Sequence, residues 1–431
     1  LLDGVPGSGK TETYFETVRT CLDQGKQALI LLPEIVLTPD WEKRFFKKFS
    51  FAPLVWNSEI TKKKKKKIWL SALNGTAGVI VGARSALMIP FSNLGLIIVD
   101  EEHEQAFKQE ENVRYNARDM AIYRSTRSSS PIVLASATPS LETFYNAKNG
   151  KYIHLTLPKR ATGATLPDIK LIDLTAHPPG KGKWLSPILV GEIESKLNNK
   201  EQSLLFLNRR GYAPLSICNS CGDKIKCVNC DAWLVEHRSK NLLVCHHCGY
   251  SRIFKNVCKK CGVEDQIKAC GPGVERIEEE IKEIFPKARL IVLSSDTMNN
   301  HKILNDTVER IKNNKVDIII GTQMIAKGHD FPNLKLVGIV DSDVGLSGGD
   351  LRASERTFQV LQQVSGRSGR HSKKEEEKGV VLIQTFDTKN PIINAISKNN
   401  RNEFFDKELV SRQHANMPPY GRLASIILSS R

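Results

Sequence analysis

The 431-residue sequence has no apolar run near the roughly 18–20 residues that a transmembrane helix needs. It also has no collagen, coiled-coil or solenoid period, which excludes fibrous and repeat architectures. Acidic residues are comparatively few: 47 Asp+Glu stand against 63 Lys+Arg, and the net charge of +16 favours a polyanionic partner, nucleic acid ahead of a membrane surface. Its apolar content of 40% excludes intrinsic disorder, and the length fits two or three domains.

An initiator methionine is also lacking. Only three residues precede a glycine-rich loop, whereas a strand that feeds such a loop usually has about five. At the other end, residues 423–428 have the pattern of a strand that is cut off at Arg431. We therefore expect an interior fragment of a longer protein, in which a missing signal peptide carries no information.

Short apolar runs recur along the chain in two series, separated by segments of helix length. Because these runs are continuous rather than alternating, they predict parallel sheets covered on both faces, and hence two α/β lobes. A cysteine-rich stretch interrupts the second series after its first strand, as an insertion. The predicted strands are 28–32, 78–81, 94–99 and 132–135 in the first series, and 203–207, 289–293, 316–320, 336–340 and 379–383 in the second.

Residues 4–11 match the phosphate-binding pattern G-x-x-x-x-G-K-[ST] in full. The glycines permit a tight backbone path that turns successive N–H groups towards a β-phosphate. Lys10 is expected to reach the β- and γ-phosphates, and the Thr11 hydroxyl to bind Mg²⁺. A chance glycine turn is the alternative, but a strand remnant and a predicted helix over 11–22 flank the loop as a nucleotide site requires. The predicted nucleotide-binding residues of the loop are Gly4, Gly7, Ser8, Gly9, Lys10 and Thr11.

An acidic cluster, Asp100-Glu101-Glu102-His103, follows the apolar run 94–99 directly. A nucleotide site of this type needs a metal-holding acid at the end of a neighbouring strand. We expect Asp100 to hold Mg²⁺ and Glu101 to orient or deprotonate the attacking water. The alternative is a surface turn whose acids cap the next helix.

Two arginines late in the second series complete the predicted hydrolytic machinery. Residues 363–370 read Gln-Val-Ser-Gly-Arg-Ser-Gly-Arg, so Arg367 and Arg370 lie three residues apart. Positive charge supplied from outside the phosphate loop stabilises a γ-phosphate in transit. If these arginines face Lys10 across the two lobes, hydrolysis is tied to lobe closure. A plain phosphate- or RNA-contacting turn is the alternative.

Eight of the ten cysteines form four C-x-x-C pairs, each of which is half of a tetrahedral thiolate site. Four pairs predict two structural Cys₄ zinc sites; disulfides and an iron–sulfur cluster are the alternatives. The middle two pairs have zinc-ribbon spacing, which leaves the outer two to close on each other. The predicted ligands are Cys218, Cys221, Cys258 and Cys261 for one zinc, and Cys227, Cys230, Cys245 and Cys248 for the other.

Two charge features favour other interpretations than a DNA clamp. The six consecutive lysines 62–67 have the pattern of a solvated face. Residues 218–261 carry eight Lys/Arg and three Asp/Glu, so eight thiolates and two Zn²⁺ would leave a net charge of about +1. We expect this insertion to serve as a wedge or as a docking surface for a partner protein.

Together these stretches resemble superfamily 2 helicases of the DExH type, and within them the bacterial PriA family of primosomal helicases. The resemblance spans nearly the whole chain, and GTQMIAKGHDFP (321–332) with the cysteine insertion is far more specific than the acidic cluster alone. The matching stretches are 4–12, 32–39, 100–103, 136–142, 206–212, 321–332, 352–358 and 363–370.

The resemblance implies two RecA-like lobes and an ATP-driven 3′→5′ DNA helicase of replication restart, which recognises stalled forks, promotes primosome assembly and reloads the replicative helicase. It implies ATP, Mg²⁺ and two Zn²⁺ as cofactors, and a bacterial cytoplasmic location. The implied partners are single-stranded and forked DNA, single-stranded-DNA-binding protein and other primosome proteins. Gly328 and Asp330 would link the nucleotide to the DNA track.

By the same resemblance, the chain lacks the family's N-terminal DNA-binding region. The implied divisions are lobe 1 (1–165), the start of lobe 2 (166–216), the zinc insertion (217–263), the rest of lobe 2 (264–400) and a truncated start of the C-terminal domain (401–431).

The loop over 104–119 resembles a family loop that senses single-stranded DNA. In it Phe107, Arg114 and Tyr115 are expected to stack on bases or pair with phosphate. Two alternatives to the helicase remain: a DNA-dependent ATPase or translocase that does not separate strands, and a truncated, non-catalytic fragment that binds primosome partners.

Overall fold

The structure, a computed structural model, divides the chain into two compact units that meet in sequence at residues 163 and 164, with 409–424 belonging to the first unit. None of the helices in the described ranges is long and apolar enough to cross a membrane. The described residues are 1–33, 39–109, 113–208, 215–218, 223, 225–229, 234–237, 242–245, 250–264, 267–270, 273–293, 301–322, 325, 331–343, 351–371 and 378–424.

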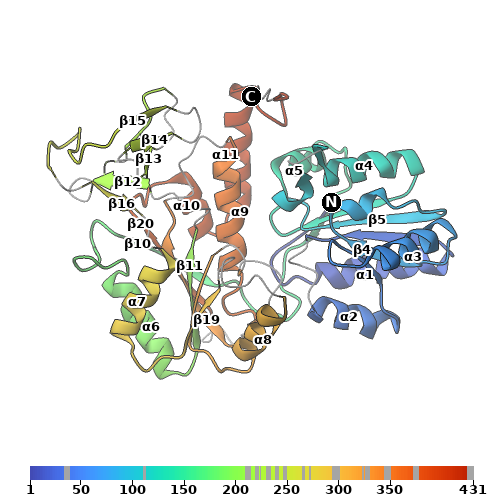
Figure 1. The fold of residues 1–431 in the computed structure, drawn as a ribbon, viewed down its shortest axis with the longest axis horizontal. Coiled ribbons are helices and arrows are strands. Elements are labelled where there is room, and N and C mark those ends of the chain that lie inside the picture. Colours follow the sequence, from blue (N-terminus) through green and yellow to red (C-terminus); the bar gives the residue numbers. More distant parts are fainter. Residues whose placement is uncertain are drawn as a thin grey trace. The chain divides into compact units, whose positions relative to one another are not determined.

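The first unit is built on a seven-stranded, wholly parallel sheet of order β3-β4-β2-β5-β8-β1-β9 (Figure 1). Its strands are β1 (Leu2–Gly4), β2 (Gln27–Leu31), β3 (Leu54–Trp56), β4 (Val79–Gly82), β5 (Leu94–Asp100), β8 (Ile132–Ser136) and β9 (Leu155–Leu157). Its principal helices are α1 (Lys10–Asp23), α2 (Pro39–Phe49), α3 (Lys62–Leu73), α4 (Ala117–Ser128) and α5 (Leu141–Lys148).

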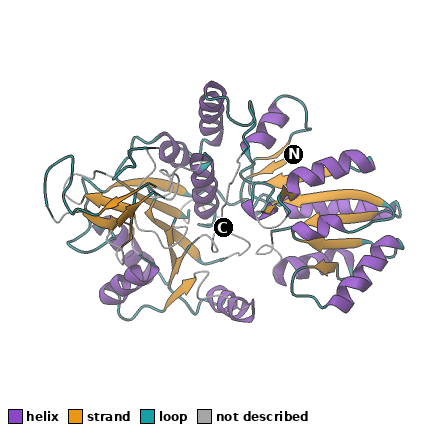
Figure 2. Cartoon of the chain, turned by 45° about the horizontal axis from the view of Figure 1, so that its top comes forward, coloured by secondary structure: helices purple, strands orange, loops and turns teal. Residues whose placement is uncertain are grey.

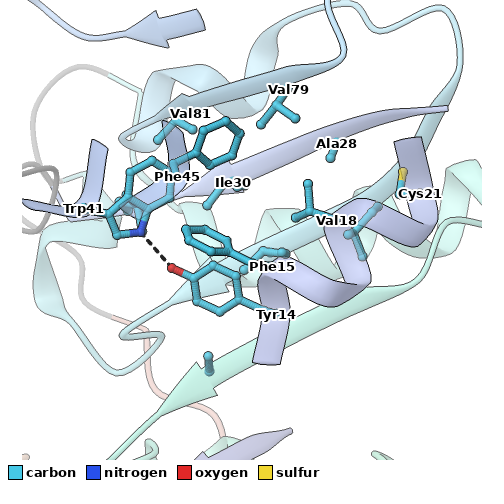
Figure 3. Packing of buried hydrophobic residues seen from close by; sticks show 14 of the residues in the cluster. Tyr14, Phe15, Val18, Cys21, Ala28, Ile30, Trp41, Phe45, Val79 and Val81 are labelled. Atoms are coloured by element: carbon cyan, nitrogen blue, oxygen red, sulfur yellow. Dashed lines mark hydrogen bonds between the residues drawn. The ribbon is translucent and has the colours of Figure 1, made fainter. Parts of the chain in front are cut away.

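Helices cover both faces of this sheet, as continuous apolar strands require (Figure 2). One face packs against α1 and α2 through a buried aromatic group (Figure 3). Phe15 lies edge-on to Trp41 and Phe45, with ring centroids 5.5 Å apart in each case. The other face packs against α3 and α4 through residues such as Ile68 and Ala121. The sheet is therefore a rigid base for the loops that leave its carboxyl edge.

The second unit contains a six-stranded parallel sheet of order β10-β20-β19-β11-β18-β17. Its strands are β10 (Asp168–Asp173), β11 (Gln202–Leu207), β17 (Leu290–Leu293), β18 (Ile318–Gly321), β19 (Leu334–Asp341) and β20 (Val380–Thr385). Its helices are α6 (Pro187–Asn198), α7 (Val274–Ile284), α8 (His301–Lys312), α9 (Ala353–Ser365) and α10 (Pro391–Ser397), and α11 (Arg401–His414) follows them.

A five-stranded antiparallel sheet of order β15-β14-β13-β12-β16 interrupts the second unit after β11. This is the predicted cysteine-rich insertion, and its change from parallel to antiparallel pairing marks it as a separate piece. Its strands are β12 (Leu215–Cys218), β13 (Val235–His237), β14 (Leu242–Val244), β15 (Ser251–Ile253) and β16 (Ile267–Cys270).

The predicted class, two parallel α/β lobes with a cysteine-rich insertion, is confirmed. All nine predicted strands are present, with ends that shift by at most two residues. Within the two parallel sheets three strands were missed. Strands β3 and β9 have only three residues each, and β10 mixes charged with apolar positions, so none forms a continuous apolar run of ordinary strand length. The predicted terminal strand over 423–428 falls mostly outside the described residues.

A buried glutamine holds the start of an interior strand in each unit. Gln27 Nε2 in β2 donates to the carbonyl oxygens of Ala72 and Ala77, at 3.1 and 2.9 Å. In the same way, Gln202 Nε2 in β11 donates to the carbonyl oxygens at the end of α8 and in the loop after it, Ile311 and Val316. The two lobes thus repeat one arrangement, in which a strand-initial amide donates to one carbonyl in the last turn of a helix and to one carbonyl in the loop after it.

Replacing Gln27 with Met should lower the free energy of unfolding by roughly 1–3 kcal/mol, because the Ala77 carbonyl loses its side-chain donor. The Ala72 carbonyl keeps the Gly75 and Ser92 amides as donors. The Gln27 side chain also accepts from the Ser92 hydroxyl and the Asn93 amide, whereas Gln202 Oε1 accepts no hydrogen bond among the described residues. Gln202→Met should therefore cost less. Urea denaturation measures both changes. Exposed Gln24→Met is the matched control, and an equal loss in Gln24→Met and Gln27→Met would contradict the account.

Candidate nucleotide site and metal centre

The phosphate loop joins β1 to α1 at the carboxyl edge of the first sheet. Gly7 and Gly9 have φ angles of +83° and +87°, a backbone region that favours glycine. A Cβ at position 4 would collide with Ser8 Oγ, so the loop can close only on glycine there. The buried Lys10 begins α1 and donates from Nζ to the Gly4 carbonyl at 3.0 Å, which draws its ammonium across the loop.

The end of β9 and the residues after it pack on this loop, a contact that was not predicted from the sequence. The Val5 amide donates to the Leu157 carbonyl at 3.1 Å, and the Ala161 amide donates to the Gly7 carbonyl at 2.9 Å. Arg160 is buried beside Gly7, with its Cγ 3.9 Å from where a Cβ would stand. Since Arg160 lies more than 150 residues along the chain, only the pairing of β9 with β1 reveals it.

Tyr14 joins the phosphate-loop helix to the acidic cluster. Its hydroxyl accepts from Trp41 Nε1 at 2.9 Å (Figure 3). The same hydroxyl donates to Asp100 Oδ2 at 3.0 Å. Burial first, and then the Asp100 carboxylate, raise the pKa of Tyr14 well above its ordinary value, against hydrogen bonds with the Trp41 and Thr11 side chains. Tyr14 therefore contacts both residues that were expected to bind Mg²⁺, Thr11 and Asp100.

Asp100 is buried at the end of β5, where its Oδ1 also accepts from the Glu101 amide at 2.9 Å. Burial, followed by the Glu101 carboxylate, raises the pKa of Asp100 from 3.8 to about 6. Lys10 and the Tyr14 hydroxyl act in the opposite direction. A buried carboxylate with a raised pKa gains from a cation beside it, as a divalent metal would supply.

Glu101 has a left-handed backbone with φ of +50°, which turns its side chain off the strand line. Its Oε2 is buried and has no hydrogen-bond partner among the described residues, and it lies 3.7 Å from His103 Nδ1. Ser8 Oγ in the phosphate loop is a second buried oxygen without a partner there. A nucleotide phosphate and an attacking water would supply the missing partners, so these residues fit a bound nucleotide with Mg²⁺.

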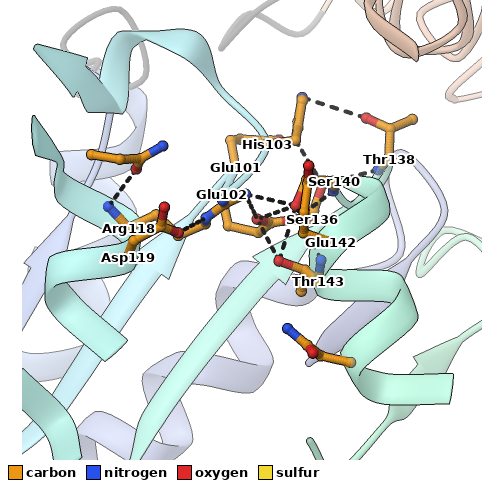
Figure 4. Close-up of polar contacts among 12 residues, drawn as sticks. Glu101, Glu102, His103, Arg118, Asp119, Ser136, Thr138, Ser140, Glu142 and Thr143 are labelled. Atoms are coloured by element: carbon orange, nitrogen blue, oxygen red, sulfur yellow. Dashed lines mark hydrogen bonds and ion pairs between the residues drawn. The ribbon is translucent and has the colours of Figure 1, made fainter. Parts of the chain in front are cut away.

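His103 contacts the segment after β8. Its Nδ1 lies 2.7 Å from Ser136 Oγ and its Nε2 lies 3.4 Å from Thr138 Oγ1 (Figure 4). The two loops that leave the ends of β5 and β8 are thus joined by one imidazole. Both stretches follow predicted strands, 94–99 and 132–135, and the parallel pairing of β5 with β8 brings them together.

Glu102, which had no assigned role, is the most enclosed member of the acidic cluster and is 1% exposed. Its carboxylate accepts from Arg118 Nη1 at 3.1 Å, from the Ser140 amide at 2.7 Å and from the Thr143 hydroxyl at 2.9 Å (Figure 4). Arg118 Nη1 also donates to Ser140 Oγ at 2.6 Å. Although burial lowers the pKa of Arg118, the Glu102 and Asp119 carboxylates raise it above its ordinary value. The pair joins the starts of α4 and α5 to the end of β5.

One residue of the expected DNA-sensing loop, Phe107, lies in the core of the first unit. Phe107 is 1% exposed and packs in the core beneath α3 and α4, so the expectation that it stacks on bases is wrong. Its apolar ring is better accommodated in the core than in water. Tyr115 is half-buried against the same core, while Arg114 is exposed. No local pattern in the sequence separates this core aromatic residue from the exposed residues of the loop.

The remaining predicted residues lie in the second unit. Arg367 is buried and Arg370 is half-buried in the turn after α9, and Arg370 Nε donates to the Gly366 carbonyl at 2.9 Å. The arginine-finger role of both residues stays a prediction. Gly328 and Asp330 lie outside the described residues.

Three cysteines of the insertion lie together. The Sγ atoms of Cys218, Cys258 and Cys261 are all within 4.8 Å of one another, and those of Cys218 and Cys261 are 3.6 Å apart. Tetrahedral Zn–S bonds of about 2.3 Å place sulfurs about 3.8 Å apart, so this spacing suits zinc. The fourth predicted ligand, Cys221, is outside the described residues.

The second set of cysteines is represented by two buried members. Cys227 and Cys245 lie in one small core with Leu234 and Leu243. Cys230 and Cys248 fall outside the described residues. The grouping separates the middle pairs from the outer pairs, which is the arrangement that their spacing favoured.

Arg118→Met should lower the free energy of unfolding by about 3–5 kcal/mol, because it leaves the Glu102 carboxylate buried without its cation. The double variant Glu102→Gln/Arg118→Met should recover at least half of this loss, since no charge then remains buried. Arg127→Met, on the exposed side of α4, is the matched control and should change stability by at most about 0.5 kcal/mol. Urea denaturation of the four proteins decides the matter, and a loss in Arg118→Met no larger than in the control would refute it.

Comparison with known proteins agrees with this geometry. A DEAD/DEAH box helicase model matches residues 1–147, a PriA DNA helicase Cys-rich region model matches 227–252, and a helicase conserved C-terminal domain model matches 256–372. Among solved structures, Mycobacterium smegmatis helicase Lhr bound to ssDNA and AMP-PNP superposes with a TM-score of 0.53 at 13% identity, covering 93% of this chain and 46% of that one. Saccharomyces cerevisiae Dbp5 bound to RNA and ADP BeF3 gives 0.51 at 15%, covering 96% and 88%. These two likenesses show the fold.

Curated relatives match along the whole chain. Replication restart protein PriA of Rickettsia felis is 48% identical over 430 residues, which are 100% of this chain and 66% of the relative. The protein of the same name from Bacillus subtilis is 39% identical over 430 residues, which are 100% of this chain and 53% of the relative. The chain thus spans less than two thirds of the length of these relatives. The resemblance drawn from the sequence is confirmed: the chain belongs to the family of the replication restart protein PriA.

Proposed function

We propose that this chain is the motor core of an ATP-dependent 3′→5′ DNA helicase of replication restart. In this proposal it acts in the bacterial cytoplasm on single-stranded and forked DNA, recognises stalled forks, and promotes primosome assembly and reloading of the replicative helicase together with single-stranded-DNA-binding protein. Family membership and the matching helicase models support it. The observation that carries it is the convergence of the phosphate loop on the acidic cluster through Tyr14, which bonds to Asp100 at 3.0 Å.

The first unit supplies the groups for nucleotide hydrolysis. Lys10 would leave the Gly4 carbonyl for the β- and γ-phosphates, and Thr11 and Asp100 would hold Mg²⁺. Bound Mg²⁺ neutralises phosphate oxygens. Glu101, with its unbonded Oε2, would accept a proton from the attacking water or orient it. His103 would carry the state of this site to Thr138, since its ring nitrogens already lie near Ser136 and Thr138.

The second unit would supply the remaining groups. Arg367 and Arg370 would stabilise the charge that develops on the γ-phosphate, and Gly328 and Asp330 would couple the nucleotide to the DNA track. The family resemblance supports these four roles. If these roles depend on closure of the two lobes, ATP hydrolysis would be converted into movement along a DNA strand.

Single-stranded DNA should stimulate ATP hydrolysis by this chain, and Lys10→Ala should lower the stimulated rate roughly 100-fold or more, because it removes a charge from the phosphate site. Exposed Lys43→Ala on α2 is the matched control and should keep the rate. Forked duplexes with either a 3′ or a 5′ single-stranded arm then test strand separation and polarity. Hydrolysis without separation would favour a translocase, and no hydrolysis at all would favour a non-catalytic fragment.

We further propose that the insertion binds two structural zinc ions. The outer cysteine pairs would hold one ion and the middle pairs the other, in support of which Cys218, Cys258 and Cys261 cluster and Cys227 and Cys245 share a separate core. Closed thiolate sites of this kind stabilise a fold and do no chemistry. The insertion would then serve as a wedge or a docking surface for a partner protein.

The purified chain should contain two zinc ions after dialysis, and Cys218→Ser and Cys227→Ser should each lose one of them. Metal analysis by atomic emission measures the content, and the core residue Cys21 supplies the control, since Cys21→Ser should keep both ions. Iron in place of zinc, or full zinc retention in either ligand variant, would overturn the assignment.

A further inference from the structure

The lysine run 62–67 begins helix α3, and the function proposed above makes no use of it. Thr61 caps the helix, with its hydroxyl accepting from the Lys64 amide at 3.3 Å, so the lysines occupy the first two turns. They crowd one another at spacings of three and four residues, and the positive end of the helix dipole disfavours cations there. Within the part of the chain that the structure describes, none of the six forms an ion pair. This helix start therefore retains positive charge that no ion pair among the described residues of the run offsets.

Aromatic rings accompany these lysines. Trp56 ends β3, and Trp69 lies on α3 with 40% of its surface exposed. Their ring centroids are 6.4 Å apart at an interplanar angle of 41°, and Lys65 Nζ lies 5.9 Å from the Trp56 ring. Lys62, Lys66 and Trp69 follow one another at helical spacing, so they share one face of α3. We call Trp56, Trp69 and Lys62–Lys67 the lysine–tryptophan surface.

The sheet fixes where this surface stands. Because β3 runs parallel to its neighbours, the start of α3 lies at the carboxyl edge, the edge that also carries the phosphate loop and the acidic cluster. In the strand order, β3 and β1 are five positions apart, or about 24 Å at about 4.8 Å per strand. The surface thus extends the functional edge away from the nucleotide.

Hydrogen bonds connect this surface to the expected DNA-sensing loop. Trp56 Nε1 donates to Ser85 Oγ at 3.2 Å, and the adjacent Arg84 donates from Nη1 to the Lys108 carbonyl at 3.0 Å. Lys108 belongs to the loop over 104–119 that resembles a sensor of single-stranded DNA. A strand lying on that loop would meet Arg84 and then the lysine–tryptophan surface.

We propose that the lysine–tryptophan surface binds single-stranded DNA, with the lysines on the phosphates and the Trp69 indole stacked on a base. That the ligand is a nucleic acid and not an acidic protein follows from the aromatic rings. That the nucleic acid is DNA rests on the proposed function. Residues 54–73 hold six lysines and one acid, a net charge of +5, which complements any polyanion. The exposed Trp69 ring, set among lysines, adds a face for base stacking, which an acidic protein does not need.

Binding should be measured with fluorescently labelled oligo-dT by anisotropy, without nucleotide, over about 50 to 200 mM salt. In Lys63→Gln/Lys64→Gln/Lys66→Gln the affinity should fall roughly tenfold or more, and the slope of log affinity against log salt should shrink by about 2, because three phosphate contacts are lost. The control triple Lys26→Gln/Lys43→Gln/Lys47→Gln removes equal charge from exposed positions away from α3 and should keep the wild-type slope. Equal slopes in the two triples would overturn the proposal.

Trp69 separates a nucleic acid from an acidic protein. Trp69→Ala should weaken oligo-dT binding about 5-fold or more, and Trp69→Phe should restore most of it, since a ring is what stacks. Polyglutamate should compete less well than oligo-dT at equal charge; equal competition with no effect of Trp69→Ala would reassign the surface to an acidic protein. If oligo-dT binding depends on the lysine–tryptophan surface but DNA does not stimulate ATP hydrolysis, the motor proposal alone is refuted. If DNA stimulates ATP hydrolysis but oligo-dT binding is unchanged by substitutions in the lysine–tryptophan surface, this proposal alone is refuted.

Discussion

The first unit depends on the enclosure of one negative charge. Glu102 sits at the turn where β5 ends, and four hydrogen bonds from Arg118, Ser140 and Thr143 hold its carboxylate. An ionised group at this depth is tolerable only when such partners surround it. Those partners begin α4 and α5, so satisfying one carboxylate fixes the helices on either side of β8. The neighbouring Asp100 is thereby held at the strand end, where its Oδ2 accepts from Tyr14 of the phosphate-loop helix.

The parallel sheet converts distant stretches of sequence into neighbours. Phosphate loop, acidic cluster and the segment around Ser136 lie up to about 130 residues apart, yet each leaves the carboxyl end of a strand in the order β5-β8-β1. Tyr14 and His103 then join them by side-chain contacts of 3.0 and 2.7 Å. The strand order alone therefore brings the phosphate loop, the acidic cluster and the segment around Ser136 close together at this edge.

Sequence reasoning recovered the parts that a local pattern marks. The phosphate loop, the acid cluster, the paired cysteines and the nine continuous apolar strands each carry their own signature. It missed Tyr14, Trp41, Arg118 and Arg160, because nothing around these residues distinguishes a side chain that bonds to a distant acid or lies against a distant loop. It also misjudged Phe107, since an aromatic residue in a loop looks the same whether it faces a base or the core. Pairings set by three-dimensional order leave no mark on a single sequence.

The link from Trp41 through Tyr14 to Asp100 has a spectroscopic consequence. Trp41 is stacked on Phe45 and shielded from solvent, and its indole N–H is two hydrogen bonds from the carboxylate. Charge arriving at Asp100 polarises the phenol and, through it, the indole. We therefore expect the fluorescence emission of Trp41 to change with what Asp100 binds. The indole would then act as an optical reporter, inside the core, of the carboxyl edge of the first sheet.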